Sequence, residues 1–229
     1  WVRAILPVHI LGHPVDMEPI VAVARKYELA VVEDASEALG ARYGEKSVGS
    51  LGDIACFSFN GNKIITTGGG GALITDDETL AGKAKHLTTT AKQSHPWLFL
   101  HDKVGFNYRL PNINAALGCG QLEQLHEYVD AKRALALRYQ EWIDPLEDVA
   151  FFCEPVGTRS NYWLNALLLE NRDVRDEFLQ YTNDAGVMTR PMWTPMHTLP
   201  MYQNCQRDDL TTAQAIEARL VNVPSSVIR

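Results

Sequence analysis

Leu29-Ala30-Val31-Val32-Glu33-Asp34 is an apolar run that ends in two carboxylates, and the chain before it has the pattern of a strand followed by a helix. Residues 5–10 form an earlier apolar run, and the apolar residues within 16–27 recur at the spacing of a helix. A strand, a helix and a strand within about 30 residues predict a βαβ unit, because parallel neighbours need a crossover connection. The sequence therefore predicts an α/β protein.

The rest of the chain divides into two parts. We predict strands at 54–59 and 72–75, a helix from 76 to about 90, and a helical stretch at 114–142 that is interrupted near Glu127. Beyond Asp144-Pro145 the pattern predicts strands at 162–169 and 187–190 and helices at 174–184 and 211–220. The pattern in this second part is typical of a smaller α+β domain. We therefore expect domains at 1–125 and 126–229, with the long helix connecting them.

Composition excludes several classes of protein. The chain has 229 residues, 46% of them hydrophobic and 21% charged, with a net charge of −7, which excludes a disordered chain and disfavours a nucleic-acid partner. No apolar run is long enough to span a membrane, and we expect a cytoplasmic protein. The four cysteines are widely separated and form no CxxC motif, so we predict small buried hydrophobic residues in a reducing compartment and neither a zinc knuckle nor a redox dithiol. No metal site is expected.

Two residues stand where a parallel sheet would bind a ligand. Asp34 follows a buried strand, and its carboxylate suits a cationic ring nitrogen or ribose hydroxyls. The alternative is that Asp34 and Glu33 are a helix N-cap or solvated acids. Lys63 follows the strand that ends at Phe59, in a loop where glycine lets the backbone approach a ligand. Its alternative is a surface lysine in a flexible loop.

Motifs along nearly the whole chain resemble one enzyme family. The resemblance is to the DegT/StrS-type nucleotide-sugar aminotransferases, nearest their bacillosamine and legionaminate branch, and it rests on the ordered segments 5–9, 12–14, 32–40, 57–63, 105–109, 190–193, 195–197 and 224–226. It implies fold type I of the pyridoxal-phosphate enzymes. Residues 1–125 would then be part of a cofactor-binding large domain with a mainly parallel sheet, and 126–229 the small domain. It also implies that the N-terminal part of the family is missing here.

The resemblance assigns roles around the cofactor, pyridoxal 5′-phosphate. Lys63 matches the lysine that forms a Schiff base and moves protons, and Asp34 matches the aspartate that pairs with the pyridinium nitrogen. Ser58 matches a phosphate-binding serine, and Asn107 matches an asparagine that reaches the phosphate from the neighbouring subunit of a homodimer. Glu37 is expected near the cofactor ring oxygen. Glu37 could instead be an exposed helical acid, and Asn107 a turn residue that caps the next helix.

The resemblance also implies a substrate side and a reaction. Trp193 and His197 resemble substrate-binding residues, and Arg190 could face a sugar-nucleotide phosphate or the carboxylate of the amino donor. The implied reaction moves an amino group, from glutamate, to a nucleotide-linked 4-keto-6-deoxy sugar in surface glycan biosynthesis. Related dehydratases replace the lysine with histidine, so Lys63 counts against them. A non-catalytic or regulatory sugar-nucleotide-binding homologue is the alternative from another class.

Overall fold

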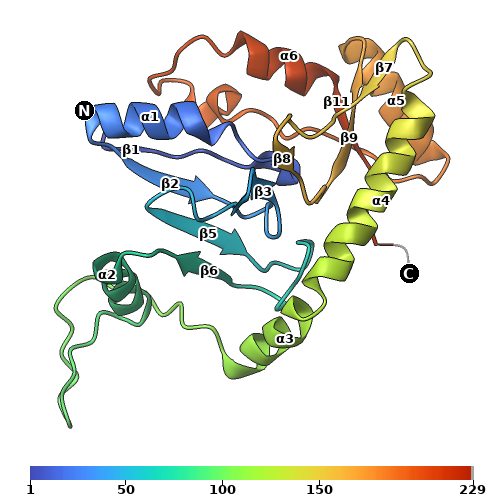
Figure 1. The fold of residues 1–229 in the computed structure, drawn as a ribbon. Helices are drawn as coiled ribbons and strands as arrows, with labels where there is room; N and C mark the ends of the chain where they lie inside the picture. The colour runs from blue at the N-terminus through green and yellow to red at the C-terminus, as the bar shows by residue number, and fades with distance from the viewer. Residues whose placement is uncertain (228–229) are drawn as a thin grey trace. The chain divides into compact units, whose positions relative to one another are not determined.

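The computed structural model describes residues 1–227 and divides the chain into two compact units (Figure 1). The first unit comprises residues 1–130 and 154–163, and the second comprises 131–153 together with the chain from 164 onward. The predicted division at 125 and 126 falls close to the first crossing point. Residues 154–163, however, cluster with the first unit. The assignment of these parts as functional domains stays a prediction.

A four-stranded sheet forms the centre of the first unit. Its order is β1 (Ala4–Ile5), β2 (Ala30–Asp34), β5 (Ile54–Ser58) and β6 (Gly71–Ile74). The pairs β1–β2 and β2–β5 are parallel, while β6 runs antiparallel to β5. The α/β class is thus confirmed. The first predicted strand is shorter than expected, because the chain turns at Ile10–Gly12 into a 3₁₀ helix, η1.

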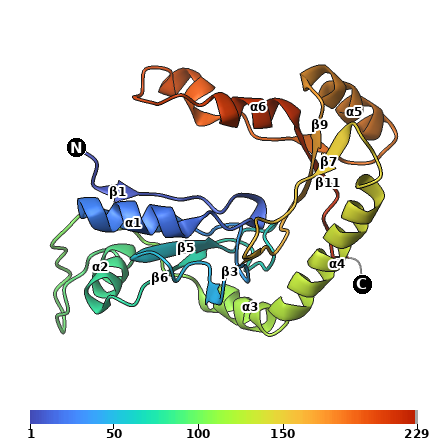
Figure 2. The same cartoon turned by 45° about the horizontal axis from the view of Figure 1, so that its top comes forward.

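Two apolar clusters hold this sheet. Helix α1 (Met17–Tyr27) lies along β1 and β2, where its Met17 and Ala24 pack with Val31 (Figure 2). The second cluster joins the buried Phe57 of β5 to the loop after β2, and its members are Ala35, Ala38, Ala41, Val48 and Phe57. Alternation along β5 therefore buries Ala55 and Phe57 and leaves Cys56 and Ser58 half-buried on the other face.

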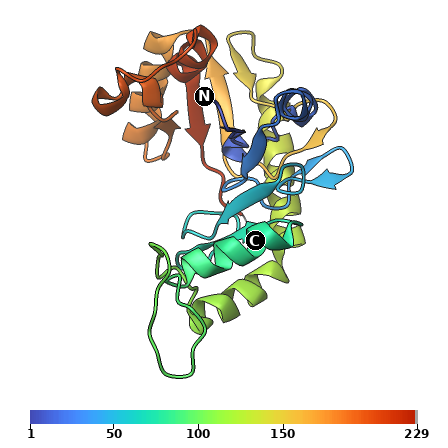
Figure 3. The same cartoon turned by 90° about the vertical axis from the view of Figure 1, so that its left-hand side faces the viewer.

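Helices and short strands complete the first unit. Helix α2 (Glu78–Thr88) begins at Asp77, whose side chain accepts hydrogen bonds from two backbone N–H groups. A long loop, residues 89–111, then reaches beyond the sheet (Figure 3). It leads to α3 (Asn112–Leu122) and α4 (Leu125–Ile143), so the helix break lies just before the predicted position. A small antiparallel sheet joins β4 (Lys46–Ser47), β3 (Arg42–Tyr43) and β8 (Thr158–Arg159).

The second unit is an antiparallel sheet with helices. The strand order is β10 (Arg190–Pro191), β11 (Leu220–Val223), β9 (Asn165–Leu169) and β7 (Val149–Phe151), and the added helices are α5 (Arg172–Asp184) and α6 (Thr211–Arg219). Two 3₁₀ helices, η2 (Met196–Thr198) and η3 (Pro200–Tyr202), precede α6. The predicted strand 162–169 begins only at Asn165, because Tyr162 has a positive φ of 46°.

The exposure of the cysteines differs from the prediction. The prediction of buried cysteines is wrong for Cys119, Cys153 and Cys205, which are exposed, while Cys56 is half-buried. Cys119 is exposed because α3 buries no residue except Gly118.

Within residues 1–227, no helix combines the length and the apolar character that crossing a bilayer requires.

Candidate active site

Asp34 stands at the carboxyl end of β2, between β1 and β5. Its Oδ1 accepts a hydrogen bond from the Ser36 N–H at 3.0 Å and lies 3.8 Å from the Cys56 sulfur. Within residues 1–227 its Oδ2 accepts no hydrogen bond, and no helix begins in the loop after it, so the N-cap interpretation is wrong. A half-buried carboxylate oxygen is therefore available to a cationic ligand at the strand end.

Glu33 points to the other face of β2 and has a structural task. The side chain is fully buried and accepts hydrogen bonds from the N–H groups of Gly49, Leu51 and Gly52 at 2.6–2.8 Å. His9 Nε2 donates to it at 3.1 Å, while His9 Nδ1 accepts from the Val15 N–H. Burial opposes the charged form, but these donors hold the pKa of Glu33 below its ordinary value. The interpretation of Glu33 as a solvated acid is therefore wrong.

Glu37 lies in the loop after β2 and faces inward. Its side chain is 17% exposed and its Oε2 accepts a 2.6 Å hydrogen bond from the Leu11 N–H, so it is not an exposed helical acid. Leu11 is buried with a φ of 57°, a left-handed conformation that costs leucine roughly 1–2 kcal/mol. Burial raises the pKa of Glu37, and the nearby Asp34 raises it further, against lowering by Leu11 and Lys63.

Lys63 turns its amine toward Glu37. The Nζ atom lies 3.7 Å from Glu37 Oε1, and the lysine side chain is only 13% exposed. The backbone N–H of Lys63 donates to the Asn60 carbonyl at 3.0 Å, which closes the turn after β5. The alternative of a solvated surface lysine is therefore wrong. Since Glu37 interacts with both Lys63 and Asp34, the three charged groups belong to one site.

Trp163 is the residue that sequence reasoning missed. The Lys63 Nζ lies 4.1 Å from the centroid of its ring, and the indole is 3% exposed. Nothing in the local sequence marks Trp163, because it lies a hundred positions from Lys63 and inside a segment with the pattern of a strand. Only the return of residues 154–163 to the first unit brings the two together.

The segment 160–163, which we call the strap, is bound tightly to the site. Asn161 is buried, and its side-chain N–H groups donate to the carbonyls of Glu37 and Leu39, both at 2.9 Å. The Ser160 hydroxyl donates to the Gly12 carbonyl at 2.8 Å. A Cβ on Gly12 would stand 1.9 Å from Asn161 Oδ1, and Gly12 has a φ of +92°, so only glycine fits there.

Ser58 and Asn107 take different places in this unit. Ser58 ends β5, and its Oγ accepts a long, 3.4 Å hydrogen bond from the Asn60 N–H. Asn107 is exposed on the loop before α3, and within residues 1–227 it makes no side-chain hydrogen bond. The structure therefore does not bring Asn107 to Lys63 of the same chain, and a role in a neighbouring subunit stays a prediction.

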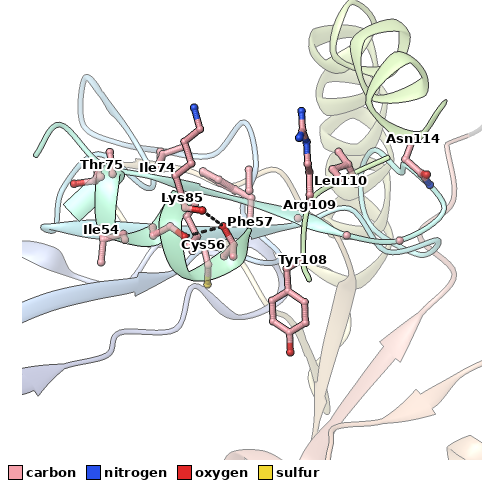
Figure 4. Close-up of a pocket in the computed structure, with 18 of the residues that line it drawn as sticks. Ile54, Cys56, Phe57, Ile74, Thr75, Lys85, Tyr108, Arg109, Leu110 and Asn114 are labelled. Carbon is pink, nitrogen blue, oxygen red and sulfur yellow. Dashed lines mark hydrogen bonds between the residues drawn. The ribbon is translucent and has the colours of Figure 1, made fainter. Parts of the chain in front are cut away.

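Asn107 lines a large groove beside β5 and β6. The groove has a volume of about 1140 Å³, with strands β5 and β6 along one side and helix α2 and residues 107–111 along the other. Lys85 and Arg109 extend to one side of it and Tyr108 to the other (Figure 4). Its lining is mainly apolar, so this part of the unit differs in character from the charged site at Lys63.

The predicted substrate residues all lie in the second unit. Arg190 is on β10, where its guanidinium donates to Asn183 Oδ1 at 3.1 Å. Trp193 follows this strand and is half exposed, and His197 in η2 lies 3.0 Å from the Gln214 amide nitrogen. The roles of these residues toward a substrate stay predictions.

The residues of the first unit fit pyridoxal 5′-phosphate. The Asp34 Oδ2 is open to a pyridinium nitrogen, and the Ser58 hydroxyl donates no hydrogen bond within residues 1–227 and so can donate to a phosphate. The Lys63 amine is shielded from solvent, and within residues 1–227 an ion pair and an aromatic face are what hold it. Carboxylate, hydroxyl and primary amine are the three groups that this cofactor needs.

Comparisons with known proteins show which enzymes this chain resembles. GDP-perosamine synthase of Escherichia coli O157:H7 is 40% identical over 97% of this chain and 60% of its own length. The putative pyridoxal phosphate-dependent aminotransferase EpsN of Bacillus subtilis is 38% identical, over 87% of this chain and 51% of its own. The crystal structure of the aminotransferase TlmJ from Streptoalloteichus hindustanus superposes with a TM-score of 0.91 at 27% identity, over 97% of this chain and 60% of that one.

The family assignment follows from a match over almost the whole chain. The chain spans about 60% of the length of the E. coli relative and of the TlmJ structure. Pyridoxal 5′-phosphate is the cofactor of the family, and the B. subtilis relative EpsN is named for its dependence on it. Because the family model matches residues 2–227, the chain belongs to the DegT/DnrJ/EryC1/StrS aminotransferase family.

Proposed function

We propose that the protein transfers an amino group to the keto carbon of a nucleotide-linked 4-keto-6-deoxy sugar, with glutamate as the donor, for surface glycan biosynthesis in the cytoplasm. The observation that carries the proposal is the shielded Lys63 amine, 3.7 Å from Glu37, with Asp34 at the neighbouring strand end. A primary amine held this way suits a reaction with a carbonyl compound.

Each of three residues would hold one part of the cofactor. Asp34 would bind the ring nitrogen, Ser58 the phosphate, and Lys63 the aldehyde carbon. When bound, the cofactor supplies an electron sink that stabilises negative charge on the carbon next to the transferred nitrogen. Asp34 supports this chemistry because an ionised carboxylate keeps a ring nitrogen protonated through a charge-assisted hydrogen bond.

Lys63 and Glu37 divide the proton chemistry between them. As a neutral amine, Lys63 takes a proton from the substrate carbon, and as an ammonium it returns one. Glu37 Oε1, at 3.7 Å from Nζ, stabilises the ammonium form. The Leu11 N–H fixes the other carboxylate oxygen, so Glu37 keeps its orientation while Lys63 changes charge. The strap shields this exchange from water.

The names of the relatives support a sugar substrate. The E. coli and Caulobacter vibrioides proteins, 40% and 39% identical to this chain, are both named GDP-perosamine synthase, which supports a nucleotide-linked sugar as the acceptor. Arg190 would bind a phosphate of the nucleotide or the donor carboxylate, and Trp193 and His197 the sugar. Asn107 would complete the phosphate site of a partner subunit in a homodimer. The closer likeness to the bacillosamine and legionaminate branch stays a prediction.

Reduction with borohydride tests the central assignment. The protein is incubated with pyridoxal 5′-phosphate, reduced and digested, and the modified peptide is identified by mass spectrometry. We expect the pyridoxyl group on Lys63, and Lys63→Arg is the matched control that keeps the charge but cannot be modified. A pyridoxyl group on another lysine, or on none, would contradict the proposal. Consumption of glutamate with a nucleotide-linked 4-keto-6-deoxy sugar then tests the donor and the acceptor.

A further inference from the structure

The proposed reaction assigns no role to Trp163, a close neighbour of Lys63. Trp163 is a nearly buried aromatic residue, 3% exposed, and its ring centroid lies 4.1 Å from Lys63 Nζ. Two other lysines lie over aromatic rings, Lys26 over Tyr27 at 5.1 Å and Lys92 over Phe99 at 4.0 Å. Those rings are 60% and 78% exposed, so of these three contacts that of Trp163 is the one shielded from water.

Trp163 is fixed by one hydrogen bond of its indole and one of its backbone. The indole Nε1–H donates to the carbonyl of Asn62 at 2.7 Å, and Asn62 is the residue directly before Lys63. The backbone N–H of Trp163 donates to Asn161 Oδ1 at 2.8 Å. The ring is therefore tied to the same turn that carries the lysine, and it cannot swing away from Nζ without breaking the partly buried hydrogen bond to Asn62.

The two groups beside the Lys63 amine both attract a cation. Glu37 offers a carboxylate at 3.7 Å, and Trp163 offers the electron-rich face of an indole. Attraction between a cation and an aromatic face is stronger where water is excluded, and tryptophan is the best of the aromatic partners. The lysine side chain is 13% exposed, so water contributes little to holding the ammonium.

We propose that Trp163 is a positioning residue for Lys63, whose ammonium rests between the indole face and Glu37 whenever the amine is not joined to another group. The proposal rests on the proposed function, in which Lys63 is the reacting amine. In that reaction the amine must leave the cofactor and come back. Trp163 gives the released amine one defined position, so the lysine side chain does not move into solvent.

Fluorinated tryptophans at position 163 test the attraction without changing the shape of the ring. Each added fluorine weakens the negative face, so the ring holds the Lys63 amine less strongly and the amine reacts faster with an acylating reagent. Lys63 is labelled with trace acetic anhydride at pH 8 in the intact, cofactor-free protein and quantified by peptide mass spectrometry. We expect the rate to rise with each fluorine, up to roughly fivefold for the most substituted ring. A flat series or a falling one would overturn the proposal.

Three controls separate this effect from others. The Lys26 rate, measured in the same digests, must stay constant. The same fluorinated series at Trp97, which is 75% exposed, should leave the Lys63 rate unchanged. A Trp163→Phe variant keeps an aromatic face and should label at a rate below that of Trp163→Leu. Because the labelling needs no cofactor, a fluorine-dependent rate without a pyridoxyl group on Lys63 would reject the proposed function and leave the role of Trp163 intact.

Discussion

Glu33 and Asp34 are adjacent carboxylates with opposite surroundings. Alternation along β2 sends Glu33 into a cradle of three backbone N–H groups and His9, and leaves Asp34 half-buried at the strand end. One carboxylate therefore stabilises the fold and the other is available for chemistry. The two residues predict different outcomes when each loses its charge.

Asp34→Asn should leave the fold intact and lower the rate of transamination. The variant loses a charge-assisted bond to the ring nitrogen, so we expect a drop of roughly 10–100-fold. The rate is measured with the cofactor-loaded variant, and circular dichroism checks the fold. Wild-type turnover in a folded, loaded variant would show that Asp34 has another role.

Glu33→Gln should instead lower stability. An amide cannot accept all four hydrogen bonds, and the loss should cost about 3 kcal/mol of the free energy of unfolding. In the native protein the pKa of Glu33 is held below its ordinary value of 4.5, so its stabilisation is full above that pH and disappears as the pH falls. Urea unfolding at pH 7 and at pH 4 measures this, and the difference between wild type and variant should shrink at the lower pH.

Sequence reasoning found the residues whose position on a strand is informative. Asp34, Ser58 and Lys63 were predicted because each stands at or just after the end of a strand, or within a motif. The contacts of Leu11 and Trp163 were not predictable. Leu11 contributes a backbone N–H in a left-handed conformation, and Trp163 comes from a distant segment. No local sequence pattern indicates a left-handed backbone at Leu11 or the contact of Trp163 with Lys63.

At the scale of elements, the strap decides how the site is held. The Asn161 side chain donates to two carbonyls of the loop that carries Glu37, and the Asn161 backbone N–H donates to the Gly12 carbonyl at 3.4 Å. Long elements were predicted well: helices α1, α2, α5 and α6 and strands β2, β5 and β6 lie within a few residues of the predicted ranges. The two-residue strands β3, β4 and β8 were missed because so short a segment has no periodicity.

Asn161→Ala should loosen the strap. The substitution leaves the carbonyls of Glu37 and Leu39 and the N–H of Trp163 without their buried partner, which should cost roughly 2–4 kcal/mol. The matched control is Asn60→Ala, at an exposed position, where the change should stay within about 0.5 kcal/mol. Chemical unfolding of both variants gives the comparison, and equal losses would mean that the strap adds no stability.

At the scale of the whole molecule, the proposed function implies that a partner subunit completes the active site. Asn107 is exposed and does not meet Lys63 in its own chain. In a homodimer with shared sites, a Lys63→Ala subunit and an Asn107→Ala subunit would together form one site with both residues intact.

Mixing these two inactive variants should therefore restore activity. Subunit exchange at equal concentrations should give up to about a quarter of the wild-type rate, because half of the dimers are hybrids and each has one intact site. Mass spectrometry of the intact dimers verifies that hybrids form. Verified hybrids without activity, or a fully active monomer, would rule out the shared site.

The chain passes between its two units three times, after residues 130, 153 and 163. No single cut therefore separates the units, and a simple exchange of everything after residue 130 would carry the strap away with the second unit. Such a chimaera would replace Asn161 and Trp163 by whatever the donor has, although Lys63 itself is kept. A recombinant that exchanges the whole second unit but keeps its own strap must be joined at three points, after residues 130, 153 and 163. A single crossover after residue 130 would thus alter the surroundings of Lys63 together with the second unit.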